Sequence, residues 1–148
     1  MKAVIQVVEN ATLKVSDKLI SSIKNGLVVY FCVEKEDDEE KLNYFAKKIA
    51  QLRIFVDENG KMNKSVKDIG GEILLVSQFT LAGNCEHGNR PSFISAELPE
   101  RANALYLKLG KILNEVYQIP VKFGVFGADM TISQKNRGPV TIILTDNK

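Results

Sequence analysis

The sequence predicts a single mixed α/β domain in which many strands form a closed or strongly curved, β-barrel-like sheet, accompanied by two main helices. Three observations lead to this prediction. The N-terminal region is rich in strand-like segments, two later segments show helical periodicity, and three more short strand-like segments follow the second helix. With 148 residues, of which 45% are hydrophobic and 26% charged, the chain is the size of one ordinary domain, expected over residues 1–148.

Strands joined by tight turns are expected in the first half of the chain. Asn25-Gly26 is a strong turn signal. The apolar run that follows it, residues 27–33, is typical of a strand buried on both faces. The strands expected in this half are residues 4–8, 12–15, 19–23, 27–33, 52–56 and 72–79.

Two helices interrupt the strands. The first follows the acidic run 34–40, which we interpret as a solvated helix start because carboxylates are favoured near the positive end of a helix dipole. Its apolar stripe is Leu42, Phe45, Ala46, Ile49 and Ala50. The second helix opens at Pro99 and is stopped by Pro120. Its apolar stripe is Ala102, Leu105, Leu109, Ile112, Leu113 and Val116. The C-terminal strands are expected at residues 121–126, 130–134 and 140–144.

Composition excludes several classes of protein. No apolar stretch approaches the roughly 20 residues that span a bilayer, and the N-terminus reads as a strand, so we expect a cytoplasmic protein without a membrane segment. A net charge of +2 argues against strong non-specific binding to nucleic acid. Cys32 and Cys85 are expected as free thiols. With His87 as the single histidine, no metal site and no cofactor are expected, and a Cys85–His87 catalytic pair is less favoured than a loop thiol and a solvated imidazole.

Three segments depart from what a purely structural domain would need. In the first, an apolar strand ends in Ser77, Gln78, Phe79 and Thr80. Where a strand ends, backbone N–H groups leave the ladder, and those of Phe79 and Thr80 are candidates to stabilise an oxyanion in acyl transfer. An ordinary strand end is the alternative.

The second segment is a turn between two strands, made of Asn136, Arg137, Gly138, Pro139, Val140 and Thr141. X-Pro is the peptide bond at which cis costs least, and glycine allows a ligand to approach closely. The alternative is a simple tight turn at the start of an edge strand. The third segment contains Phe126, Gly127 and Met130, which suit a slot for a flat base or, equally, a corner of the core.

These segments, in this order, resemble the D-aminoacyl-tRNA deacylase family, formerly called D-tyrosyl-tRNA deacylases. The resemblance covers essentially the whole chain. Its most specific part is the combination of Ser77-Gln78-Phe79-Thr80-Leu81 with Asn136-Arg137-Gly138-Pro139-Val140-Thr141. No Ser-His-Asp set is available from one histidine, so an enzyme of this composition lacks a good side-chain base.

The resemblance implies a β-barrel-like α/β homodimer with two active sites at the subunit interface, acting on the aminoacylated 3′ end of tRNA. It implies a cis bond between Gly138 and Pro139 that reaches into the partner's pocket, where main-chain carbonyls hold the α-amino group and exclude L-residues. D-residues, and glycine mischarged on the alanine tRNA, would be accepted and removed. A vicinal ribose hydroxyl would assist the reaction. Thr80 has also been considered a nucleophile in this family, but we expect it only to position substrate. Phe126, Gly127 and Met130 would hold the terminal adenosine.

Two positions depart from the family pattern. Val7 stands where an arginine usually braces the Gly-Pro segment, and Ala82 stands where an aromatic residue is common. The Val7 departure leaves two alternatives open. One is a non-catalytic module that binds the tRNA end. The other is a relative of relaxed chirality whose bond between Gly138 and Pro139 is trans.

Overall fold

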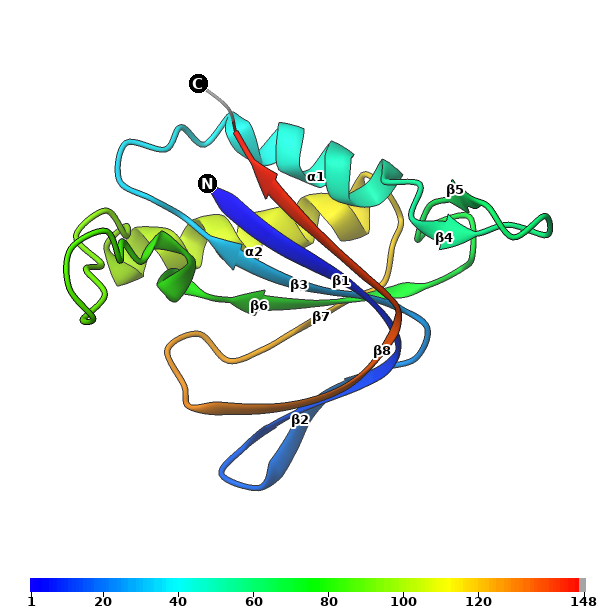
Figure 1. Ribbon diagram of the computed structural model, residues 1–148, viewed down its shortest axis with the longest axis horizontal. Coiled ribbons are helices and arrows are strands. Elements are labelled where there is room, and N and C mark those ends of the chain that lie inside the picture. Colours follow the sequence, from blue (N-terminus) through cyan, green and yellow to red (C-terminus); the bar gives the residue numbers. More distant parts are fainter. Residues whose placement is uncertain (147–148) are drawn as a thin grey trace.

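One long strand organises the sheet. In the computed structural model, which describes residues 1–146, β1 (Lys2–Val15) pairs antiparallel with β2 (Lys18–Ile23), β3 (Gly26–Cys32) and β8 (Met130–Thr145). The sheet continues in parallel from β3 to β6 (Glu72–Ser77) and from β6 to β7 (Val121–Phe123). A separate two-stranded sheet is formed by β4 (Phe55–Val56) and β5 (Met62–Lys64). Figure 1 shows that β1 and β8 bend together, so that the sheet is strongly curved, as predicted.

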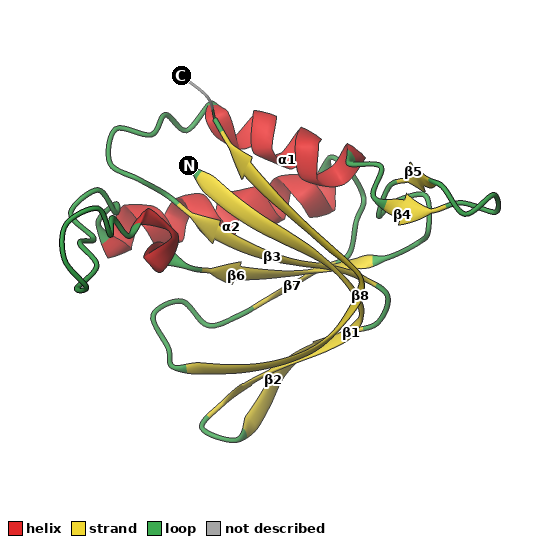
Figure 2. Ribbon diagram, in the orientation of Figure 1, coloured by secondary structure: helices red, strands yellow, loops and turns green. Residues whose placement is uncertain are grey.

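Both helices cover one face of the sheet. Helix α1 (Lys41–Gln51) and helix α2 (Pro99–Glu115) lie together on the same side of it (Figure 2). Their buried residues form the main core with β1, β3 and β6, including Ile5, Val29 and Leu75. A second, smaller cluster fills the inside of the bend and includes Leu13, Val28 and Val76. Two clusters on opposite faces explain why β3 is apolar along almost its whole length, as predicted for a strand buried on both faces.

Several predicted boundaries are wrong, and the largest errors concern merged strands. The expected strands 4–8 and 12–15 are one strand, β1, because an irregularity in pairing with β8 at Glu9 accommodates the polar residues without ending the ladder. The expected strands 130–134 and 140–144 are likewise one strand, β8. The expected strand 52–56 retains only Phe55–Val56, and 121–126 retains only Val121–Phe123. Strand β6 ends at Ser77, because Phe79–Ala82 form a short 3-10 helix, η1.

The acidic run is only partly solvated. Helix α1 begins directly after it, at Lys41, but Asp37 is buried and ion-paired with Lys41. Lys41 also pairs with Asp146 at the end of β8, so the cation joins the helix to the sheet. Burial opposes ionisation of Asp146, but the hydrogen bonds from Lys41 and the N-terminal ammonium outweigh it and lower the pKa of Asp146 to about 2. Part of the run therefore ties α1 to the C-terminal strand. None of the helices in residues 1–146 is long and apolar enough to cross a membrane.

Gly26 begins β3 and pairs with Glu72 of β6. A Cβ atom at this position would lie 1.8 Å from the backbone carbonyl oxygen of Glu72, its pairing partner. We therefore expect Gly26→Ala to lower the free energy of unfolding by about 3 kcal/mol, since two backbones must separate. Chemical denaturation would measure the loss, with Ser22→Ala on exposed β2 as the control. A midpoint equal to that of the parent protein would contradict this assignment.

Candidate active site

A pocket opens where β3 and β6 end. Its volume is about 500 Å³, and we call it the strand-end pocket. Because β3 and β6 are parallel, their carboxyl ends meet at one edge of the sheet, and the segment after β7 returns to the same edge. The lining residues from the sheet side are Phe31, Cys32, Val33, Val76, Ser77, Gln78 and Phe79. Those from α2, its preceding loop and the start of β8 are Ala96, Glu97, Pro99, Ala102, Tyr106, Phe126, Gly127, Ala128, Met130 and Ile132.

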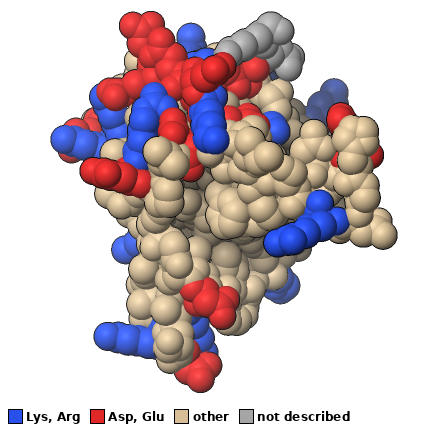
Figure 3. All heavy atoms as spheres, turned by 90° about the vertical axis from the view of Figure 1, so that its left-hand side faces the viewer, with Lys and Arg blue, Asp and Glu red and all other residues tan. Residues whose placement is uncertain are grey.

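The pocket joins two of the three segments singled out in the sequence. Ser77, Gln78 and Phe79 face Phe126, Gly127 and Met130 across it, whereas Thr80 is exposed and does not line it. Figure 3 views the side of the molecule on which this edge lies. Charged side chains gather at the top of that face, and its middle is largely uncharged. A site of this kind suits an uncharged, partly apolar group better than a phosphate.

The end of β6 leaves backbone donors near the pocket. The N–H of Gln78 still donates to the carbonyl of Phe31 at 2.8 Å, and the chain then turns into η1. The first N–H groups of a helix have no acceptor within that helix, so those of Phe79 and Thr80 are directed away from the ladder. The side-chain amide of Gln78 donates to the hydroxyl of Thr80. Phe79 is 56% exposed and packs edge-on against Phe93, with ring centroids 5.2 Å apart.

The buried side of the pocket contains weak acids that stay protonated. Burial, together with the nearby carboxylate of Glu34, raises the pKa of Cys32 to about 11, and its thiol donates to the carbonyl of Phe79 at 3.6 Å. Burial also raises the pKa of Tyr106, whose hydroxyl donates to the carbonyl of Leu75 at 2.8 Å. Neither group is a base near neutral pH, and neither is activated as a nucleophile.

Glu97 supplies a carboxylate to the lining, but that carboxylate is already occupied. It accepts a hydrogen bond from the N–H of Leu98 and pairs with Arg101, and these contacts lower its pKa. Among the described residues that line the pocket, no side chain is therefore placed as an uncommitted general base. The sequence had indicated the same shortage from its single histidine. It had not indicated Cys32 or Tyr106 as pocket residues, although a tyrosine hydroxyl beside the apolar stripe of α2 is a signal for a buried polar contact.

The segment after β7 forms a tight corner at the mouth. Gly127 has a φ of +76°, which favours glycine, and Ala128 donates to the carbonyl of Val125 at 3.1 Å. The sulfur of Met130 accepts from the N–H of Val125 at 3.4 Å. Phe126 packs against Tyr106 with ring centroids 6.2 Å apart. The corner thus contributes an aromatic ring and a thioether to the pocket wall while remaining part of the core.

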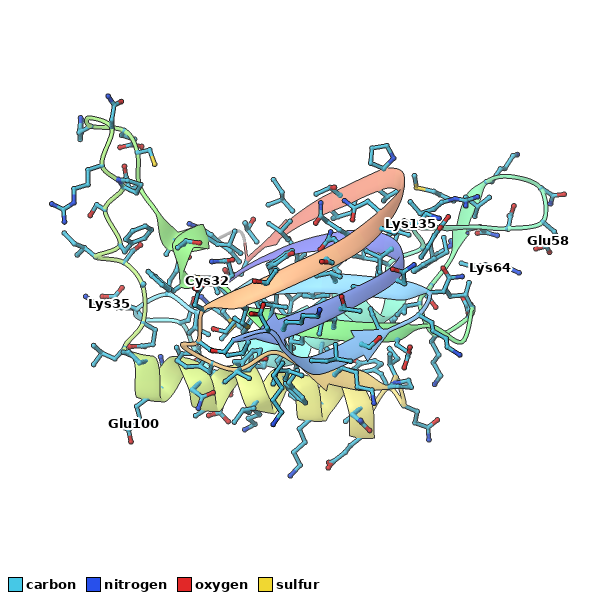
Figure 4. All side chains as sticks on the ribbon, turned by 90° about the horizontal axis from the view of Figure 1, so that it is seen from below. Cys32, Lys35, Glu58, Lys64, Glu100 and Lys135 are labelled. Carbon is cyan, nitrogen blue, oxygen red and sulfur yellow. The ribbon has the colours of Figure 1, made fainter. Side chains whose placement is uncertain are left out.

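The second of these segments, residues 136–141, lies elsewhere. Residues 137–140, which we call the Gly-Pro loop, bulge from β8 and are not part of the strand-end pocket of the same chain. Gly138 and Pro139 are exposed, and the bond between them is cis, so the trans bond that the relaxed-chirality alternative required is absent. Cys32 lines the pocket and Lys135 lies at the base of the loop, and Figure 4 shows these two residues toward opposite ends of the sheet. Within one chain, the structure does not bring together all the residues predicted for the site.

The fold and the pocket define an enzyme-like α/β domain with a largely apolar pocket, in which backbone donors lie nearby and no uncommitted side-chain base is found among the described lining residues. The family model for D-Tyr-tRNA(Tyr) deacylase matches residues 4–145. A D-aminoacyl-tRNA deacylase of Geotalea daltonii is 52% identical over 100% of this chain and 98% of its own. One from Syntrophus aciditrophicus is 48% identical over 100% of this chain and 99% of its own.

Two solved structures have the same fold. The structure of a protein described as a c-Myc DNA unwinding element binding protein is 41% identical and superposes with a TM-score of 0.93, covering 100% of both chains. That of a probable eukaryotic D-amino acid tRNA deacylase is 18% identical, with a TM-score of 0.81 over 97% of both chains, and so shares the fold. The chain belongs to the D-aminoacyl-tRNA deacylase family. It is a hydrolase that acts on the ester bond of D-aminoacyl-tRNA, with tRNA as the substrate carrier.

Proposed function

We propose that this protein removes D-amino acids from tRNA, and glycine from the alanine tRNA, while sparing L-aminoacyl-tRNA, as a quality-control step of translation in the cytoplasm. The active unit would be a homodimer without a cofactor. Each site would combine the strand-end pocket of one subunit with the Gly-Pro loop of the other. The observation that carries this proposal is the position of the loop, whose residues are not among those that line the strand-end pocket of its own chain and whose base, at Lys135, lies toward the opposite end of the sheet from Cys32.

Selection would depend on main-chain atoms of the loop. Gly138 and Pro139 are exposed, which supports a role in contact with another subunit. Nearby on β8, Ile143 is 74% exposed, and it pairs with Val4 of β1. The exposed Ile143 and the partly exposed Val4 beside it give this sheet face an apolar surface that the second copy would cover. The carbonyls of the loop, which includes Val140, together with Asn136 and Thr141 on either side of it, would hold the α-amino group and leave no room for an L side chain.

Catalysis would rely on backbone donors and on the substrate. The N–H groups of Phe79 and Thr80 would stabilise the oxyanion formed when water attacks the ester carbonyl, with Ser77 and Gln78 positioning the carbonyl group. The vicinal hydroxyl of the terminal ribose would assist by proximity, and the tRNA leaves with its ribose hydroxyl protonated. Phe126, Gly127 and Met130 would hold the terminal adenosine. The protonated states of Cys32 and Tyr106 support a mechanism without a side-chain base.

The direct test compares three substrates on one preparation. Release of tyrosine from D-Tyr-tRNA and of glycine from glycyl-tRNA for alanine, with L-Tyr-tRNA intact, is the expected result. Survival of all three esters at stoichiometric protein would disprove the catalytic proposal. Binding of the RNA without turnover would instead support a non-catalytic module.

Thr80 distinguishes backbone catalysis from a covalent mechanism. Its hydroxyl is exposed and accepts a hydrogen bond from the amide of Gln78, and it does not line the pocket. We expect Thr80→Ala to lower kcat for D-Tyr-tRNA by less than about tenfold, because the N–H group remains. Single-turnover hydrolysis would measure it, with Thr80→Ser as the matched variant. Complete loss in Thr80→Ala with activity kept in Thr80→Ser would show that the hydroxyl is the nucleophile.

A further inference from the structure

The ladder between β1 and β8 is irregular on both sides of Val8. Val8 pairs with Asn136, whereas Gln6 pairs with Thr141, so Val7 alone faces residues 137–140. On the other side, Asn10 pairs with Lys135, which leaves Glu9 as an extra residue of β1. The first irregularity releases the Gly-Pro loop from the sheet. The second places a carboxylate at the base of that loop.

Glu9 holds two cations that flank Asn136. One carboxylate oxygen accepts a hydrogen bond from Arg137 at 2.6 Å, and the other lies 2.6 Å from the ammonium of Lys135. The side chain of Glu9 is 28% exposed, whereas those of its two partners are mostly exposed. Hydrogen bonds from Lys135 and Arg137 lower the pKa of Glu9, so the carboxylate is charged near neutral pH. Arg137 directly precedes Gly138, which brings this contact into the loop itself.

A hydrogen-bonded network holds the two ends of the loop. The amide of Gln134 donates to Asn136 at 2.5 Å and to Gln6 at 2.8 Å, and Gln6 donates to Thr141 at 3.3 Å. Tyr30 of β3 anchors the network by donating to Gln134 at 2.9 Å. These contacts fix the residues before and after residues 137–140. The contact from Glu9 extends one residue further along the chain, to Arg137.

We propose that Glu9 is a positioning residue that aims the Gly-Pro loop through its contacts with Arg137 and Lys135. Val7, which faces the loop, is buried in the main core, and its side chain has no polar atom that could contact the loop. The side-chain contact from β1 to the loop therefore comes from Glu9, which lies two residues after Val7. This proposal rests on the proposed function of the loop in rejecting L-residues.

The test replaces the carboxylate of Glu9 without changing its size. In Glu9→Gln, Lys135 and Arg137 lose their common anion, and the ratio of kcat/KM for D-Tyr-tRNA to that for L-Tyr-tRNA is expected to fall about tenfold, chiefly through faster L-Tyr-tRNA hydrolysis. The Tm is expected to stay close to that of the parent protein, because an exposed ion pair contributes little to folding. Glu58→Gln is the matched control, since Glu58 pairs with Lys64 at 3.1 Å beside β5.

A charge exchange provides the rescue. Glu9→Lys and Arg137→Glu should each reduce discrimination, and the double variant should recover part of it because the pair is restored with reversed charges. Unchanged discrimination in Glu9→Gln, or a loss that tracks a fall in Tm, would overturn the positioning role. An inactive parent protein would instead refute the proposed function, so the two failures are distinguishable.

Discussion

Gly138→Ala is expected to reduce the preference for D-Tyr-tRNA over L-Tyr-tRNA by about a hundredfold, because a shift of about 1 Å in a positioning group is enough for such a loss. Gly138 has a φ of +113°, a conformation that L side chains rarely adopt. A Cβ atom there would lie 2.7 Å from Cγ2 and 2.9 Å from the backbone nitrogen of Val140. The alanine therefore forces the loop to move.

The measurement is the ratio of kcat/KM for the two esters, with Tm recorded on the same preparations. Gly60→Ala is the control, because Gly60 also has a positive φ, +76°, but its Cβ would meet nothing within 4 Å. Gly60 lies between β4 and β5, outside the proposed site. Since Gly138 is exposed on a bulge, its variant should fold about as well as the control. A preference for the D-ester equal to that of the control would refute the loop as the selective element.

Local periodicity predicted the helices well. The five stripe residues assigned to the first helix are the buried residues of α1. In the second stripe, Leu105, Leu109 and Leu113 are buried, but Val116, the residue that follows the end of α2, is 67% exposed. A helix boundary depends on the final turn and on the chain after it, so an apolar residue near a predicted end carries little information about burial.

Strand continuity could not be predicted from local pattern. Glu9 and Asn10 interrupt the alternation of β1, and residues 137–140 interrupt that of β8, so each strand looked like two. The two interruptions lie on either side of the Val8–Asn136 pair in the folded sheet, and pairing with a distant strand continues each strand beyond its interruption. Whether such a strand continues depends on its pairing register with residues far away in the sequence. Short windows of a single sequence do not contain this register.

The strand-end pocket could be predicted only in part, because its residues are brought together by contacts between segments far apart in the sequence. Ser77, Gln78 and Phe79 meet Phe126, Gly127 and Met130 because β3, β6 and β7 are parallel and end together. The family resemblance indicated these segments, whereas periodicity alone left each of them open. Tyr106 and Cys32 were missed because each lies in an apolar run in which core packing explains a buried residue equally well.

Two different inactive variants are expected to form one working site when they are combined in a heterodimer. Deleting Arg137, Gly138 and Pro139 would leave Val140 opposite Val7 and continue the register from Val8–Asn136 to Gln6–Thr141, so β8 should still pair while the loop is lost. Ala102→Trp would fill the strand-end pocket with an indole from the rigid helix α2. Each homodimer is expected to lose selective hydrolysis of D-Tyr-tRNA. The deletion homodimer lacks the loop, and the pocket of the Ala102→Trp homodimer is filled.

A heterodimer of the two variants, isolated through two different C-terminal affinity tags, contains an open pocket in the deletion subunit and an intact loop in the Ala102→Trp subunit. If each pocket is completed by the loop of the other subunit, this heterodimer has one competent site and should recover about half of the parent's selective activity, because a twofold dimer has two equivalent sites. If each chain completed its own site, both sites of the heterodimer would be defective. Activity no higher than that of the two homodimers would therefore mean that the loop serves the chain to which it belongs.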